Sequence, residues 1–127
     1  MFIADCVGVD LYFLDRGRYE IENAFVLSSA QKPLVVTGRA DGNCSLTLTN
    51  VYIKRVGPSE PALAASRSVL NATRLTLENL PLKVTGESNL KDCLIEGKAV
   101  PEDTSENGAD LPGLLKAVVP DDYCEKL

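Results

Sequence analysis

The sequence predicts an all-β domain in which short strands wind into a small parallel β-helix. We expect about three coils of 27–30 residues, followed by a short C-terminal helical cap. Two segments of nearly the same sequence recur 29 residues apart, their apolar residues alternate with period 2, and each contains an Asn at the same place. A repeat of this length is typical of stacked-repeat folds, and period 2 is typical of half-buried strands.

The repeated segment is the first element of each coil. The stretch LTLTNVYIKRVG (46–57) matches LTLENLPLKVTG (75–86) at six of twelve positions. A weaker copy, YEIENAFV (19–26), matches the first of these at a shift of 27 and places Asn23 on Asn50. Apolar alternation changes phase after the Asn in each copy. Because Asn tolerates a left-handed backbone, we expect it to bend the strand at a corner.

Shorter apolar runs between the copies complete the coil. The run LVVTG (34–38) aligns with LAASR (63–67) at a shift of 29. Each period therefore predicts a strand, an Asn corner, a second strand, a Gly turn, a loop and a short strand. Stacking such coils about 4.8 Å apart would place Leu46 over Leu75 and bury both. The corner residues would then be Asn23, Asn50 and Asn79.

The C-terminal part of the chain has a different composition. Residues 101–110 are polar and acidic and predict a linker, whereas LPGLLKAVV predicts a helix from about 112 to 119 that ends before Pro120. We therefore divide the chain into a β-helix domain, 1–100, and a linker with a capping segment, 101–127. Because the end strands of a solenoid are unpaired, we expect the segment to cover one end. No cap is evident at the N-terminal end, which predicts self-association or a partner there.

The phrases LTLTNVYI and LTLENLPL resemble those of right-handed parallel β-helix proteins of the pectate-lyase-like superfamily, over roughly residues 3–97. The resemblance implies a right-handed coil. It is generic as to function, since the superfamily includes lyases, hydrolases, phage tailspikes and non-catalytic adhesins. Its enzymes usually have many more coils than this chain allows. An antiparallel β-sandwich is the alternative fold, and the regular shift of 29 favours the β-helix.

Composition excludes several kinds of chemistry. The net charge is −5, which disfavours non-specific binding to nucleic acid because that needs a basic surface. No His is present, so a Ser-His-Asp or Cys-His nucleophile within this chain is excluded. No phosphate-binding or dinucleotide-binding motif occurs. We therefore expect no enzymatic activity and no cofactor.

The four cysteines and the apolar runs bear on metals and location. Cys6, Cys44, Cys93 and Cys124 form no CxxC pair, so we expect no metal site but reduced, mostly buried thiols, with a disulfide as the alternative. The longest apolar runs have about five residues, too few to cross a membrane. The start, MFIADCVGVD, lacks the pattern of a signal peptide, which predicts a cytoplasmic protein if these residues are the whole chain.

Candidate binding residues lie at the end of the repeat. At a shift of 29, Lys54 aligns with Lys83, which would place two ammonium groups on adjacent coils, with Tyr52 and Arg55 close by. A cluster of this kind predicts a site for an anionic ligand or an acidic protein surface. The alternative is that the lysines are solvated and discourage edge pairing, because like charges on neighbouring strands repel.

Three functional hypotheses follow. The first is a non-catalytic β-helix module that binds a protein partner or self-assembles, encoded by a phage or other mobile element. The second is a carbohydrate-binding or carbohydrate-active fragment, which predicts a groove lined with carboxylates and exposed aromatic rings. The third is an acidic inhibitor that occupies a nucleic-acid site on its target, which predicts acidic side chains gathered on one face. We favour the first.

Overall fold

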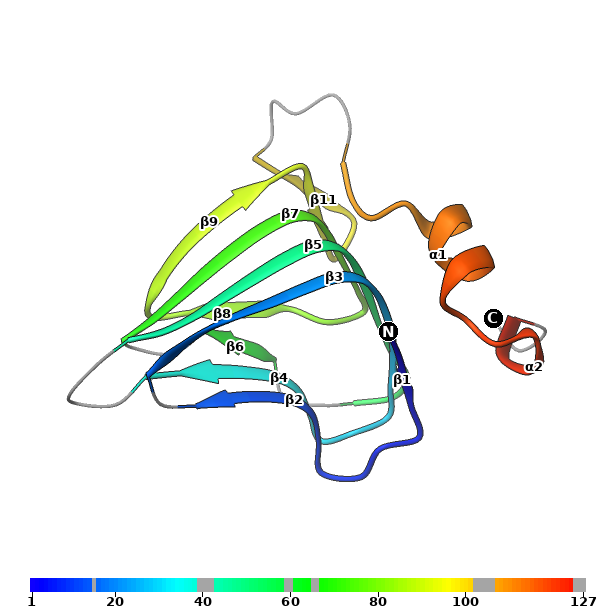
Figure 1. The fold of residues 1–127 in the computed structure, drawn as a ribbon, viewed down its shortest axis with the longest axis horizontal. Coiled ribbons are helices and arrows are strands. Elements are labelled where there is room, and N and C mark those ends of the chain that lie inside the picture. Colours follow the sequence, from blue (N-terminus) through cyan, green and yellow to red (C-terminus); the bar gives the residue numbers. More distant parts are fainter. Residues whose placement is uncertain (15, 39–42, 59–60, 65–66, 102–106, 125–127) are drawn as a thin grey trace.

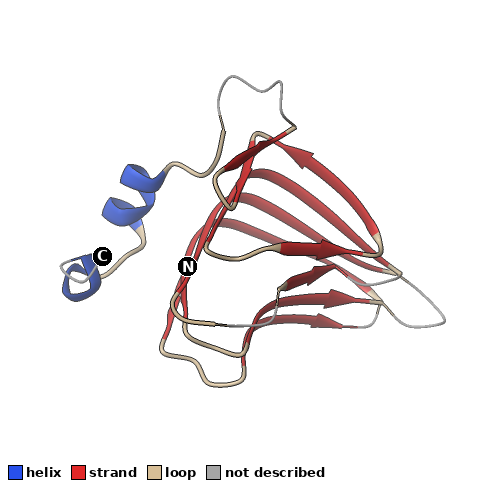
Figure 2. Ribbon diagram, turned by 180° about the vertical axis from the view of Figure 1, so that it is seen from behind, coloured by secondary structure: helices blue, strands red, loops and turns tan. Residues whose placement is uncertain are grey.

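The computed structural model describes residues 1–14, 16–38, 43–58, 61–64, 67–101 and 107–124. Most of them form strands in two sheets (Figures 1 and 2). The large sheet has the strand order β1-β3-β5-β7-β10-β11, with β9 also pairing with β7, and the small sheet has the order β2-β4-β6-β8. The strands are β1 (Phe2–Ala4), β2 (Val9–Leu14), β3 (Gly17–Ser28), β4 (Lys32–Thr37), β5 (Cys44–Arg55), β6 (Ala62–Ala64), β7 (Ser68–Glu78), β8 (Leu82–Val84), β9 (Glu87–Lys91), β10 (Cys93–Ile95) and β11 (Lys98–Val100).

The prediction of an all-β protein is confirmed. From β1 to β8 the chain alternates between the large and the small sheet, and the neighbours within each sheet over this stretch are parallel. The large sheet is nevertheless mixed, because β10 and β11 pair antiparallel as a hairpin.

The predicted Asn corner is confirmed for two of its three members. Asn23 and Asn50 have φ of 56° and 55°, and the register of β3 with β5 places them side by side. The amide Nδ2 of Asn50 donates to Oδ1 of Asn23 at 2.8 Å. In β7, however, the corner residue is Arg74, with φ of 56°, and Asn79 lies beyond the strand. A polar residue that accepts a left-handed backbone is the shared requirement.

The predicted register of the repeat is therefore wrong. Leu46 pairs with Leu70 and not with Leu75, so β5 and β7 are related by a shift of 24. The shift from Asn23 to Asn50 is the predicted 27, whereas β9 follows β7 at a shift of only 18. Coil length thus varies along the chain and is not a constant 27–30 residues.

The core lies between the two sheets and is aliphatic, as the scarcity of aromatic residues predicts. Burying each such side chain contributes roughly 1.5–3 kcal/mol. Cys44 and Cys93 are buried thiols within it, whereas Cys6 is half-buried and Cys124 is exposed, and none of the four forms a disulfide. The largest fully buried aliphatic residues of the strands are Leu34, Val36, Leu46, Leu48, Ile53, Leu70, Leu75 and Leu77.

The C-terminal segment forms two short helices, α1 (Leu111–Ala117) and α2 (Asp121–Cys124). The predicted helix near 112–119 is thus confirmed, with Asp110 as its N-cap: the Asp110 side chain accepts a hydrogen bond from the Gly113 amide. Among the described residues, no helix is both long and apolar enough to span a membrane.

The segment does not cover an end of the sheets, as predicted, but runs along the outer side of the large sheet (Figure 1). The Ala109 amide donates to Oγ1 of Thr76 on β7 at 2.8 Å, and the Asp110 amide donates to Oδ1 of Asn50 on β5 at 2.7 Å. Further along, the Tyr123 ring lies 4.9 Å from that of Phe2 on β1. The segment therefore crosses several strands and leaves the edges of the sheets open.

Candidate functional site

Two of the four predicted binding residues lie together on the outer side of β5. The Tyr52 ring stacks on Phe25, with centroids 5.3 Å apart and ring planes 4° apart, and its hydroxyl donates to the Glu78 carboxylate. Burial, and then this hydrogen bond and the Glu78 charge, raise the pKa of Tyr52 above its ordinary value. Tyr52 therefore remains neutral over the physiological pH range.

Lys54 lies beside Tyr52 but does not stack on another lysine. The register places Lys54 opposite Glu78, so the predicted pair of like charges is an opposite-charge pair. A hollow of about 270 Å³ opens here between the sheet and the C-terminal segment. It is lined by Phe25, Tyr52, Lys54, Glu78, Leu111, Leu115 and Cys124. The segment from the same chain thus already contacts the surface that the sequence suggested for a ligand.

Arg55 is not a surface residue, in contrast to the prediction. Its side chain is 6% exposed, and its guanidinium donates to the carbonyl oxygens of Ser28, at 3.2 Å, and of Pro58. The Ser28 hydroxyl in turn donates to Oδ2 of Asp10 at 2.5 Å. Alternation explains the error, since Arg55 lies an odd number of residues from Tyr52 and Lys54 lies on neither of their inward positions. Arg55 therefore has a structural role.

Lys83 lies on the other sheet. It is an exposed residue of β8, at the edge of the small sheet, and pairs with Leu63 of β6. The structure therefore brings Tyr52 and Lys54 together and separates both from Arg55 and Lys83.

Exposed apolar side chains gather at a different place, the N-terminal end of the two sheets. Among the described residues, seven large apolar side chains are exposed, and five of them belong to the first nineteen residues. These five lie on β1, β2, the turn between them and the start of β3, which together form one edge of the molecule (Figure 1). They are Met1, Val7, Tyr12, Leu14 and Tyr19.

The backbone at this end is also without strand neighbours in the part of the chain that the structure describes. β2 pairs only with β4, and β1 reaches only Phe25–Leu27 of β3. The first half of β3, residues 17–22, therefore pairs with β5 alone and has an open edge. An open strand edge presents unpaired N–H and C=O groups to any chain that can add a strand. We call residues 17–22 the open edge.

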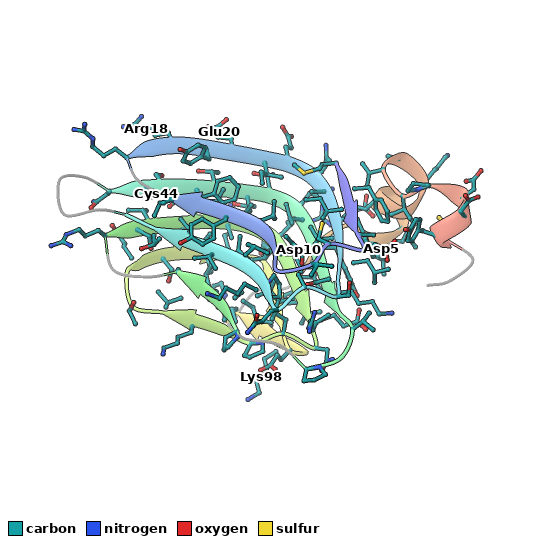
Figure 3. The ribbon with its side chains drawn as sticks, turned by 90° about the horizontal axis from the view of Figure 1, so that it is seen from below. Asp5, Asp10, Arg18, Glu20, Cys44 and Lys98 are labelled. Carbon is teal, nitrogen blue, oxygen red and sulfur yellow. The ribbon has the colours of Figure 1, made fainter. Side chains whose placement is uncertain are left out.

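The open edge carries charge outside and an aromatic ring inside. Arg18 and Glu20 project from the rim of the molecule (Figure 3), and both are exposed. Tyr19 points the other way, with its ring 5.1 Å from that of Phe13 on β2, and it is still 37% exposed because no further coil covers it. A hollow of about 710 Å³ lies along this face, lined by residues 17–20 together with Asn43, Ser45, Thr47, Val69 and Asn71.

The sequence indicated an uncovered N-terminal end but did not indicate these residues. The stretch RGRYEIE, residues 16–22, contains the signal that could have found them. Its charges alternate with Tyr and Ile in the period of a strand, and basic residues precede acidic ones. This pattern was hidden because the search for repeats compared residues between coils and not within one strand.

Comparisons with known proteins give no match: no protein family model, no curated protein and no solved structure resembles this chain significantly. Within the described residues, no group of three or more Cys, Asp or Glu side chains is placed to hold a metal ion.

Proposed function

We propose that the chain is a short right-handed parallel β-helix that acts as a non-catalytic protein-binding module through its N-terminal end. Three features support the fold. Strands alternate between two sheets, strands related by one coil pair in parallel, and Asn23, Asn50 and Arg74 bend the long strands at one corner. Such a stack buries its aliphatic residues only where a further coil or another protein covers them.

One observation carries the function, namely the coincidence of exposed apolar side chains with open strand edges. Tyr12, at 50% exposure, and Tyr19 lie on the two strands whose outer edges are open. Proteins usually protect such edges, because they add strands from other chains. A protein partner that adds a strand here would satisfy the backbone groups and cover the apolar side chains at once.

The two alternative hypotheses have less support from the geometry. A carbohydrate site would need an accessible aromatic platform beside carboxylates, but Tyr52 already stacks on Phe25 and donates to Glu78. An acidic inhibitor would need one acidic face, whereas the open edge carries Arg18 beside Glu20. Association through the N-terminal end accounts for more of the exposed surface than either.

A site-specific photo-crosslinker tests the proposal. Benzoylphenylalanine replaces Tyr12 in one variant and Val84 in a control, an exposed apolar position on β8, the edge strand at the opposite end of the small sheet. On irradiation in the cells that produce the chain, we expect a discrete protein adduct from the Tyr12 position and little from the control. Equal yields of adduct from both positions, or none from Tyr12, would overturn the proposal.

A further inference from the structure

We infer that the partner at the open edge is a second copy of this chain, which pairs antiparallel with residues 17–22 about a two-fold axis at Tyr19. This inference rests on the proposed function and names its partner. The same patch then serves both molecules, as in most symmetric dimers.

The charges of the open edge are complementary to themselves. In an antiparallel pair centred on Tyr19, Arg18 of each copy lies opposite Glu20 of the other, and Gly17 lies opposite Ile21. Directly opposed side chains on neighbouring strands interact, and opposite charges stabilise the pair. The symmetry produces this contact twice. Edges that are protected from association usually carry like charges, which would repel a second copy in any such pairing.

The backbone geometry fits the same register. The Gly17 amide donates to the Asn43 carbonyl on the β5 side, at 3.4 Å. Since successive residues of a strand direct their N–H and C=O groups to opposite sides, those of Arg18 and Glu20 point to the open edge. In an antiparallel ladder, two opposed residues that both point inward exchange two hydrogen bonds. Arg18 and Glu20 therefore form a hydrogen-bonded pair on each side of the axis.

The apolar side chains add to the interface. Tyr19 lies on the two-fold axis, so the rings of the two copies meet there and cover each other's exposed surface. A two-fold axis perpendicular to the large sheet keeps both small sheets on the same side. It therefore brings the two β2 strands, with Tyr12 and Leu14, toward one another, because β2 is the edge strand of the small sheet at the same end (Figure 1).

The test is a charge exchange across the axis, with the molar mass measured by light scattering over a dilution series. Reductant is present, so that the exposed Cys124 cannot link two chains. We expect the purified wild type to approach twice the mass of one chain, 13.7 kDa. Arg18→Glu or Glu20→Arg alone turns two attractive contacts into two repulsive ones and weakens the dimer at least about tenfold.

The double variant Arg18→Glu with Glu20→Arg restores opposite charges, and we expect it to restore the dimer. A matched control is Lys91→Glu, a charge reversal at an exposed position of β9, the open strand at the opposite end of the large sheet. It should leave the dimer unchanged.

Two results would overturn the inference. A wild type that stays monomeric at every concentration excludes the second copy as the partner. A dimer that the single reversals leave as strong as the control excludes this register. The proposed function fails separately, since it is decided by the crosslinker at Tyr12, which also reports a partner other than a second copy.

Discussion

At the scale of residues, Lys54 and Arg55 show how the strand assigns different roles to neighbouring cations. Lys54 lies on the outer side, opposite Glu78, whereas Arg55 points into the molecule and bonds to the carbonyl oxygens of Ser28 and Pro58. Within this buried cluster, Nε of Arg55 and Oδ1 of Asp10 have no hydrogen-bond partner. Buried polar groups of this kind are sensitive to the loss of any remaining bond.

Replacing each of these cations by Met separates the two roles. Arg55→Met removes the donor to two buried carbonyl oxygens, and we expect it to lower the free energy of unfolding by about 1–3 kcal/mol. Lys54→Met removes one partner of a surface charge pair and should change it by less than about 1 kcal/mol. Urea unfolding of both variants measures the difference. Equal losses would contradict the assignment of Arg55 to the interior.

Tyr52 makes stability depend on alkaline pH. Its pKa is raised in the folded state, so above the unfolded value of about 10 the unfolded chain releases this proton first. The unfolded state then binds fewer protons than the native state, and the free energy of unfolding falls as the pH rises through this range.

We expect the fall in stability between pH 9 and pH 11 to be smaller in Tyr52→Phe than in the wild type, because Phe has no proton to release. Glu78→Gln should act in the same direction, since it removes the charge and the acceptor that favour the neutral phenol. Urea unfolding at both pH values provides the measurement. A fall in Tyr52→Phe as large as in the wild type would show that other groups cause it.

At the scale of elements, Gly108 joins the C-terminal segment to the corner of the large sheet. Its amide donates to the Asp92 carbonyl at 2.6 Å, and its own carbonyl accepts from Nε of Arg74 at 3.2 Å. The next residues bond to Thr76 and Asn50. The corner residues thus have two functions, since they bend the strands and also hold the segment that crosses them.

A methyl group at this junction should release the segment. Gly108 has φ of +82°, and a Cβ there would lie 2.5 Å from Oγ1 of Thr76. Gly57 is a matched control, with φ of +80° and open space around the added carbon. Both Ala variants carry a backbone strain of roughly 1–2 kcal/mol, but only Gly108→Ala adds a steric conflict.

Hydrogen exchange shows where each change acts. In Gly108→Ala we expect faster exchange at the amides of α1, whereas Gly57→Ala should leave α1 as protected as in the wild type. The same acceleration in both variants would mean that backbone strain alone, and not contact at the corner, releases the helix.

At the scale of the whole molecule, the sequence predicted the kind of structure but not its register. Leu and Thr alternate in LTLT before the corner of β5 and in LTLE after the corner of β7, and alternation alone does not reveal which arm a segment belongs to. Apolar stacking requires only that inward residues be apolar, so Ala72 is as acceptable beside Leu48 as another Leu. Sequence identity therefore aligned Asn50 with Asn79, although Arg74 occupies the corner.

The candidate site was predictable only as a location. The absence of an N-terminal cap indicated an uncovered end, and the structure shows open strands with Tyr12 and Tyr19 exposed there. The predicted binding residues depended on the shift of 29, so they lost their common position when β7 paired at 24. The order of charges around Tyr19 becomes informative only once this half of β3 is known to be an edge.

The most direct test of self-pairing at the open edge mixes the two single reversals. The Arg18→Glu variant carries only carboxylates at these two positions, and the Glu20→Arg variant carries only guanidinium groups, so each repels its own copy and attracts the other. We predict that light scattering gives a mass near 13.7 kDa for each variant alone and about twice this mass for an equimolar mixture. A mixture that remains as monomeric as its components would contradict antiparallel pairing of this strand.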